Sequence, residues 1–284
     1  MRILVDLPIT FDVGDERTHA PMIDVLLSGT PTRLILDTGS TDHVLTIELA
    51  RTIGLAAEPG EPGTDHAGAS VGSWTLGEVD VRLGGHDITL HDTVAITGPA
   101  PFEGWGVGGF ASPQHLDPAA FAVLDLVGDR FLLIEADGDD PTIEPDLARG
   151  YPELDVLTLP RIAGEATPVV LAAIDPFPPV PTMLNTGGRG TEFATDAVPG
   201  LAGVEPDRVG HGVGGTAVHG TQVGERALRV GTATFRVPGL LVRDEVGSMR
   251  GLIGMDVLRG TVLVVSSDQH RPVMWLVPRQ ARQP

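Results

Sequence analysis

The sequence carries two copies of one series of short landmarks, and this repetition constrains the fold more than any other feature. The stretch LILDTGS at residues 34–40 has a counterpart, MLNTGG, at residues 183–188, so that Asp37 and Asn185 are 148 positions apart. Four further pairs occur in the same order at nearly the same displacement: 3–9 with 155–162, 65–85 with 210–231, 105–110 with 251–256, and 131–136 with 262–267. Such a repeat predicts a duplicated chain with two similar lobes.

The segment between the two copies has the composition of a linker. Residues 136–153, ADGDDPTIEPDLARGYPE, are acidic and contain proline, which is typical of a surface connection between folded units. We therefore expect an N-terminal lobe over residues 1–145, which carries DTGS, and a C-terminal lobe over residues 146–284, which carries NTGG.

Both lobes are predicted to consist of β-strands, so the expected fold class is all-β. The 37 Gly and 24 Pro residues favour many short strands joined by turns. Helical patterning is scarce, with short helices expected at 44–53, around 117–125 and at 255–259. Runs of β-branched residues and Leu, bounded by Gly, Pro and Asp, predict strands at 22–29, 32–37, 78–85, 87–97, 169–174, 182–185, 226–231, 234–242 and 261–266.

Composition excludes several classes of function. The 38 acidic and 19 basic residues give a net charge of −19, which makes nucleic acids and anionic membranes poor partners. The absence of cysteine excludes thiolate catalysis and Cys-based zinc sites. The N-terminus lacks the apolar core of a signal peptide, and no apolar run approaches the roughly 18 residues of a membrane span. We expect a soluble, cytoplasmic protein.

The repeated turn is where chemistry is expected. Asp37 directly follows a buried strand, and Gly39 allows another backbone to approach closely. The hydroxyl of Thr38 can form a hydrogen bond to a facing copy, and that of Ser40 can donate to the carboxylate. One DTGS is an ordinary turn sequence. Two facing copies, however, would place their acidic positions side by side, where two carboxylates share a proton and act as base and acid toward a water that attacks an amide.

On these residues the chain resembles the bilobal aspartic peptidases of the pepsin and retropepsin kind. The matching motifs are LILDTGS at 34–40 and two hydrophobic-hydrophobic-Gly signatures, GVGG at 106–109 and LIGMD at 252–256. The resemblance implies two pseudo-symmetric lobes with an active-site cleft between them, an extended peptide or protein as substrate, and Asp37 as one catalytic acid. It implies no cofactor and no metal. Because one chain supplies both halves of the site, we expect a monomer.

The resemblance also assigns supporting residues by their positions. The flap that closes over the substrate is expected to follow the first turn, and the Gly-rich run at 210–215 is its expected equivalent in the second lobe. Thr38 and Thr186 would lock the two turns together, while Gly39 and Gly187 would allow their close approach. The full set comprises the turn residues Thr38, Gly39, Ser40, Thr186 and Gly187 and the flap residues His66, Ala67, Gly68, Ala69, Ser70 and Trp74.

The chain departs from the family pattern at the second turn. Asn185 stands where the second acid is expected, and Gly188 replaces the expected Ser or Thr. The single tyrosine, Tyr151, lies in the linker and not in the flap. An amide can occupy the position of the acid and hold a water, but it cannot exchange a proton at working pH. Since general acid–base assistance contributes ~10²–10⁴-fold, we expect this sequence to be a poor hydrolase.

Three hypotheses account for Asn185. The natural protein has Asp at this position and the chain carries an engineered substitution; or the gene encodes Asn and the protein is a pseudo-peptidase that binds peptide; or Asp37 acts with another group and some activity survives. The sequence leaves all three open, although Gly188 favours natural divergence slightly.

The nine histidines favour structural roles. The pairs His86/His91 and His211/His219 lack the i, i+4 spacing of a helical metal site, which favours scattered loop residues over zinc ligands. His43, six residues after Asp37, is expected to be partly exposed on the strand that leaves the turn.

Overall fold

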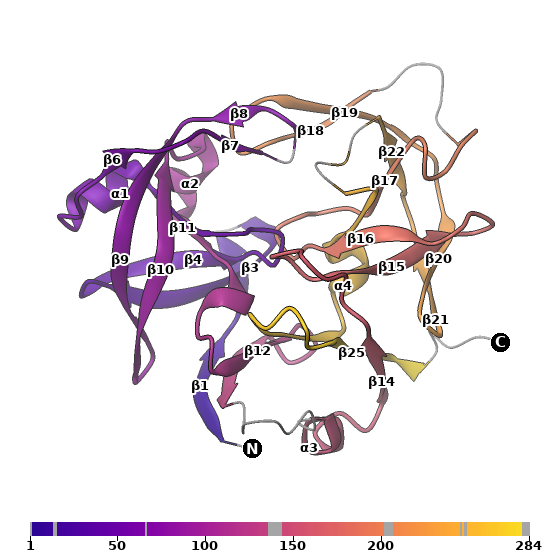
Figure 1. Cartoon of the computed structure of the whole chain (residues 1–284), viewed down its shortest axis with the longest axis horizontal. Coiled ribbons are helices and arrows are strands. Elements are labelled where there is room, and N and C mark those ends of the chain that lie inside the picture. Colours follow the sequence, from indigo (N-terminus) through magenta and orange to yellow (C-terminus); the bar gives the residue numbers. More distant parts are fainter. Residues whose placement is uncertain are drawn as a thin grey trace.

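The computed structural model describes residues 2–13, 16–65, 67–135, 144–201, 207–244, 246 and 249–279. Within these residues strands dominate, and the helices are α1 (Ile47–Thr52), α2 (Ala100–Trp105), α3 (Glu144–Arg149) and α4 (Met255–Leu258), with a 3-10 turn at Pro113–His115. Two β-rich lobes lie side by side, joined below by strands from both halves of the chain (Figure 1). The expected all-β, bilobal fold is confirmed.

The first lobe contains an eight-stranded sheet that closes on itself. Strand β3 pairs with β4 along one edge and also with β9 through Leu26 and Leu27, which join distant positions in the sheet order. The inward residues, such as Leu34, Leu36 and Leu45, are fully buried. In order, the strands are β2 (Thr10–Val13), β3 (Glu16–Leu27), β4 (Thr30–Leu36), β11 (Val107–Ala111), β5 (His43–Thr46), β10 (His86–Ile96), β9 (Ser73–Leu83) and β6 (Glu58–Pro59).

The second lobe contains a nine-stranded sheet with the same central arrangement, because a parallel strand lies on one side of its turn-bearing strand. Here β23 pairs in parallel with β16, as β11 does with β4. In order, the strands are β18 (Asp207–His211), β19 (Ala217–Gln222), β22 (Leu241–Arg243), β17 (Glu192–Ala194), β23 (Gly251–Ile253), β16 (Val180–Leu184), β15 (Val169–Ile174), β20 (Arg226–Val230) and β21 (Ala233–Val237).

A six-stranded sheet joins the two halves of the chain. Its order is β1 (Ile3–Pro8), β13 (Arg130–Glu135), β12 (Ala120–Asp125), β24 (Val262–Val265), β25 (Val273–Pro278) and β14 (Leu154–Leu159). The two halves meet where β12 pairs with β24, so β12 corresponds to β24 and β13 to β25. The sequence pairing of 131–136 with 262–267 matches β13 with β24 and is therefore wrong. Both strands of each hairpin are equally apolar, so their pattern does not distinguish them.

Two of the three expected helices are present. Helix α1 begins after Thr46, whose hydroxyl accepts the Leu49 N–H at 3.2 Å as an N-cap, and α4 occupies the predicted stretch after Gly254. The helix expected around 117–125 was wrong, because Ala120–Asp125 form β12, in which all six residues are buried. A strand buried on both faces has no alternation to reveal it. In the described part of the chain, no helix is long and apolar enough to cross a membrane.

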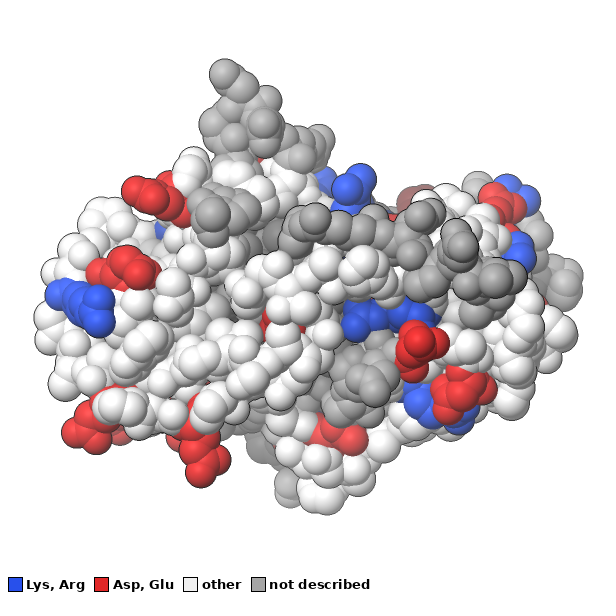
Figure 2. Space-filling model, turned by 90° about the horizontal axis from the view of Figure 1, so that it is seen from above, with Lys and Arg blue, Asp and Glu red and all other residues white. Residues whose placement is uncertain are grey.

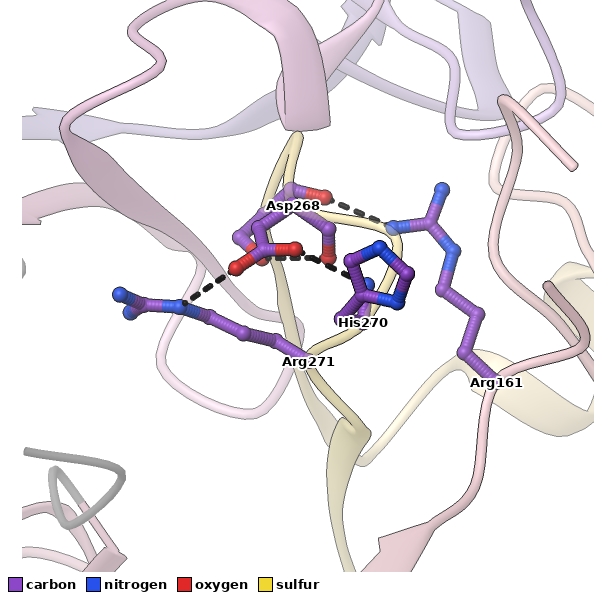
Figure 3. A network of polar contacts seen from close by, with 5 residues as sticks. Arg161, Asp268, His270 and Arg271 are labelled. Carbon is purple, nitrogen blue, oxygen red and sulfur yellow. Dashed lines mark hydrogen bonds and ion pairs between the residues drawn. The ribbon is translucent and has the colours of Figure 1, made fainter. Parts of the chain in front are cut away.

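The loop between β24 and β25 is tied to the second lobe by Arg161 (Figure 3). The Arg161 guanidinium donates to the carbonyl of Ser266 at 2.9 Å and to that of Ala166 at 2.8 Å. In the same loop the Asp268 carboxylate accepts the His270 N–H and the Arg271 guanidinium. Burial lowers the pKa of Arg161, whose Nε has no hydrogen-bond partner in the described residues. This network fixes the loop against the segment that precedes β15.

Candidate active site

The two turns begin at equivalent positions of the two lobes. Asp37 follows β4 and its N–H donates to the carbonyl of Ala111 at 2.9 Å; Asn185 follows β16 and its N–H donates to that of Ile253 at 2.9 Å. In each lobe, the turn is therefore held by the end of the neighbouring parallel strand, β11 or β23.

The strand registers correct one detail of the repeat. Gly109 lies opposite Leu34, and Gly251 lies opposite Thr182, which is the counterpart of Leu34. The structural equivalent of Gly109 is therefore Gly251, and the sequence pairing of Gly108 with Gly254 was wrong. An added Cβ at Gly109 would collide with the backbone of β5, which is the physical reason for glycine there.

Four hydrogen bonds join the two turns through their threonines. The Thr38 N–H donates to the Thr186 hydroxyl at 3.0 Å, and the Thr186 N–H donates to the Thr38 hydroxyl at 3.0 Å. The Thr38 hydroxyl donates to the carbonyl of Leu184 at 2.6 Å, and the Thr186 hydroxyl donates to that of Leu36 at 2.6 Å. Both threonines are fully buried. The two turns are thus locked face to face across the lobes.

This lock brings Asp37 and Asn185 together. A Cβ added at Gly39 would lie 2.6 Å from the Asn185 Cγ, and one added at Gly187 would collide with the Asp37 carboxylate. Each of these two side chains therefore packs directly on the glycine of the opposite turn. Any larger residue at either glycine would push the two side chains apart.

The two side chains are held by their own turns in similar ways. One carboxylate oxygen of Asp37 accepts the Gly39 N–H at 2.8 Å. The amide oxygen of Asn185 accepts the N–H groups of Gly187 at 2.8 Å and Gly188 at 3.0 Å. Because this oxygen is committed to two donors, the remaining end of the amide is its NH₂ group, which donates only.

Ser40 has a different role from the expected one. Its hydroxyl donates to the carbonyl of Asp42 at 2.7 Å and so shapes the chain that leaves the turn. Its own carbonyl accepts the Ser112 hydroxyl at 2.8 Å and the Gln114 amide at 3.1 Å. Ser40 therefore supports the turn through its backbone and is not the donor to the Asp37 carboxylate that we expected.

His43 lies beneath the first turn and is 1% exposed, so the expectation of a partly exposed residue was wrong. Its Nδ1 accepts the Ser112 N–H at 3.3 Å, and its Nε2 lies 3.3 Å from the carbonyl of His115. This pattern requires the neutral ring, with the proton on Nε2. Burial lowers the pKa of His43 to about 4. Sequence spacing could not reveal this position, because burial depends on the 3-10 turn that packs beside it.

His19 is a site residue that the sequence did not indicate. It lies on β3 of the first lobe, and its Nε2 is 3.2 Å from the carbonyl of Gly187 in the second turn. Burial lowers the pKa of His19. The contact spans 168 positions, so only the packing of the two lobes creates it.

The described residues of the expected flap lie in and after a short hairpin, β7 (Gly63–Thr64) with β8 (Ser70–Val71). Its turn contains Ala67, Gly68 and Ala69, whereas His66 lies outside the described residues. The Asp65 carboxylate, which is 6% exposed, accepts the N–H groups of Ala67 and Ala69 at 2.9 Å. Trp74 lies further along, on β9, where it packs partly buried against the core.

The second lobe contributes the matching hairpin, β18 with β19. Its Gly214 N–H donates to the Asp65 carboxylate at 3.0 Å, and the Cβ of any larger residue at Gly212 would collide with the same carboxylate. The two hairpins therefore meet at their tips, at the top of the molecule (Figure 1).

Within the described residues, no three His, Asp or Glu side chains gather in an arrangement that could hold a metal ion. The chemistry that the site offers is that of one carboxylate, Asp37, beside one amide, Asn185.

The threonine lock permits a stability test. Replacement Thr186→Val removes the hydroxyl and leaves the Thr38 N–H and the Leu36 carbonyl buried without partners. We expect the free energy of unfolding to fall by about 2–6 kcal/mol, since each of the two groups costs about 1–3 kcal/mol. The control Thr186→Ser keeps the hydroxyl and should lose less. Denaturant unfolding of the three proteins measures the difference, and a Val variant as stable as the Ser variant would contradict it.

Comparison with known proteins agrees with this geometry. The model of a family described as aspartyl protease matches residues 23–105, which include Asp37 and the first hairpin. Among solved structures, the aspartic proteinase from Irpex lacteus is similar, with a TM-score of 0.52 over 98% of this chain and 98% of that chain, at 12% identity. No curated protein matches by sequence. The chain therefore has the bilobal fold of the pepsin- and retropepsin-like aspartic peptidases.

Proposed function

We propose that this protein binds an extended peptide over the paired turns, as an aspartic-type endopeptidase does, and that Asn185 leaves its hydrolysis of peptide bonds weak. The observation that carries the proposal is the lock between the turns. Four buried hydrogen bonds and two glycine contacts bring Asp37 and Asn185 together from opposite lobes.

The roles of the two side chains follow from their chemistry. The Asp37 carboxylate accepts a hydrogen bond from a water and can take its proton as the water attacks the peptide carbonyl. In a dyad, the second group supplies a proton to the carbonyl oxygen or to the departing nitrogen. The Asn185 amide can donate a hydrogen bond to the developing oxyanion but has no proton to transfer. Asn185 can therefore stabilise the charge on the oxyanion, but it cannot act as the general acid of the pair.

The hairpins support an extended peptide as the ligand. The strands β7, β8, β18 and β19 lie at the top of the molecule, where their backbone groups can pair with an added strand. Seen from above, the described residues in the middle of this face are mainly uncharged, with arginine side chains beside them and most acidic side chains toward the rim (Figure 2). An uncharged centre suits a peptide backbone better than a phosphate or a polyanion.

A second candidate function is a pseudo-peptidase that only binds peptide. The observation that favours it is the fit of Asn185, whose amide oxygen makes two hydrogen bonds to its own turn. The turn is therefore formed with the amide in place, and binding does not require a carboxylate at this position.

Binding can be tested on the chain as it stands. We expect calorimetry to show saturable binding of an extended peptide with a statine-type hydroxyl, because that hydroxyl replaces the water held by Asp37. The same peptide without the hydroxyl should bind more weakly. Asp37→Ala should raise the Kd about tenfold, which corresponds to one charged hydrogen bond of about 1.5 kcal/mol.

The exposed Asp80→Ala provides the control, since it removes an equal charge far from the turns. The proposal fails if the folded protein gives no heat with either peptide, or if Asp37→Ala and Asp80→Ala bind the hydroxyl peptide equally.

A further inference from the structure

A cavity of about 370 Å³ lies beside the second turn. Its walls come from both lobes, with β3 on one side and the segment after Asn185 together with α4 on the other. The lining residues are Thr18, His19, Arg189, Met255, Asp256 and Arg259. A cavity built across the lobe junction is positioned to receive a group that lies along both lobes.

The cavity is a direct continuation of the candidate active site. Arg189 is the fourth residue after Asn185, and its carbonyl accepts the Asp256 N–H at 3.0 Å. On the facing wall, His19 contacts the carbonyl of Gly187. Both walls are thus fixed to the turn that carries Asn185. A peptide bound over the turns could therefore place one of its side chains in the cavity.

Most charged groups of the cavity are already engaged. Arg259 forms an ion pair with Asp129 at 3.3 Å and lies over the ring of Phe11. Asp256 accepts the N–H and the hydroxyl of Thr191 at 3.0 and 2.7 Å. The charge of Arg259 is therefore compensated by Asp129, and that of Asp256 is stabilised by hydrogen bonds from Thr191.

Arg189 differs from its neighbours. It is exposed, and no carboxylate pairs with it in the described part of the chain. Its positive charge helps to lower the pKa of His19, together with the larger effect of burial, so His19 is neutral at pH 7. Arg189 thus places a positive charge next to the candidate active site of a chain whose net charge is −19.

We propose that Arg189 selects bound peptides that carry an Asp or Glu side chain at the position that reaches this cavity. This inference rests on the peptide-binding function proposed above and adds a specificity-determining residue to it. A planar guanidinium pairs with a carboxylate through two parallel hydrogen bonds, which gives geometric selectivity as well as attraction. At physiological ionic strength the net negative charge of the chain is screened beyond about 8 Å, so the local pair determines the preference.

The test uses a set of matched statine-type peptides and the unmodified chain. Each position of the peptide carries Glu in one member and Gln in the other, and calorimetry in 0.15 M salt gives the two Kd values. We expect one position at which Glu binds about fivefold more tightly than Gln, as an exposed ion pair of about 1 kcal/mol would give. Arg189→Gln should bring this ratio close to 1. Arg189→Glu should reverse the preference, so that the Gln peptide binds more tightly than the Glu peptide at the same position.

The matched control is Arg51→Gln, which removes an exposed arginine from α1 and should leave the ratio unchanged. The inference is overturned if peptides bind but Glu and Gln are equivalent at every position, or if Arg189→Gln keeps the preference. If no peptide binds to the folded chain, the proposed function fails, and this result is distinct from equal binding of the two peptides.

Discussion

Replacement Asn185→Asp is expected to raise kcat/KM for peptide hydrolysis by at least ~10²-fold, and by up to ~10⁴-fold, because it restores a group that can give and take a proton. Two carboxylates held side by side cannot both ionise, so one is protonated where the other is charged. The activity of the variant should therefore follow a bell-shaped pH profile, with one limb from each macroscopic pKa of the pair.

The turn should accept Asp without rearrangement. The amide oxygen of Asn185 accepts the Gly187 and Gly188 N–H groups. In Asn185→Asp a carboxylate oxygen would take its place and form the same two hydrogen bonds more strongly. Restoring a Ser or Thr at Gly188 is a less suitable test. A Cβ there would lie 3.2 Å from the Asn185 amide nitrogen and 3.3 Å from Leu252, so the neighbours would have to move.

The measurement compares cleavage of a mixed peptide substrate by the unmodified chain, Asn185→Asp and Asp37→Asn/Asn185→Asp between pH 3 and pH 8. The double variant has one acid in the exchanged position and should return to the low rate, and the statine-type peptide should inhibit the single variant. A folded Asn185→Asp protein without cleavage at any pH would count against a peptidase mechanism at these turns.

The second large effect concerns acid stability, and it comes from His43. Burial lowers the pKa of this histidine from 6.5 to about 4 in the folded protein, whereas the unfolded chain keeps the ordinary value. As the pH falls from about 6.5 toward 4, His43 becomes protonated in the unfolded state but stays mostly neutral in the folded state. The free energy of unfolding therefore decreases through this range, by about 2.5 kcal/mol at pH 4.5 from His43 alone.

His43→Gln isolates this contribution. We expect the unmodified protein to lose stability between pH 7.5 and pH 4.5, and the variant to lose about 2.5 kcal/mol less over the same range. Burial lowers the pKa of His19 and His115 in the same direction, so part of the pH dependence will remain in both proteins.

Denaturant unfolding at the two pH values gives the comparison, and His91→Gln is the control because that ring is largely exposed. An equal loss of stability in the unmodified protein and in His43→Gln would show that the ring is not buried in its neutral form. Protonation of the His43 ring would break its contacts with Ser112 and His115, so the fold around the Asp37 turn should be less stable at strongly acidic pH.

The peptidase-like turns could be recognised from sequence because they depend on local chemistry. A buried strand that ends in Asp-Thr-Gly, and its copy with Asn, predicts two equivalent turns, and most of the predicted strands are present. The errors occur where local pattern is ambiguous. The pattern around 117–125 predicts a helix where Ala120–Asp125 form a strand, because a strand buried on both faces has no alternating pattern. The two strands of each central hairpin are equally apolar, so the sequence repeat pairs the wrong strands.

Other features depend on segments that are distant in the chain. The burial of His43 is set by Ser112 and His115, the contact of His19 by a turn 168 positions away, and the hairpin contact of Asp65 by Gly214. Nothing in the spacing around these residues indicates their partners, because each partner is brought near only when the two lobes pack.

The sequence by itself determined the all-β class and the pair of turns that carry Asp37 and Asn185, because strand formation and turn chemistry depend on neighbouring residues. The tertiary structure alone decided that the two side chains lie on each other's glycines, that His43 is buried in its neutral form, and that Arg189 lines a cavity shared by both lobes. These features arise from desolvation and from contacts between distant segments, which exist only in the folded chain.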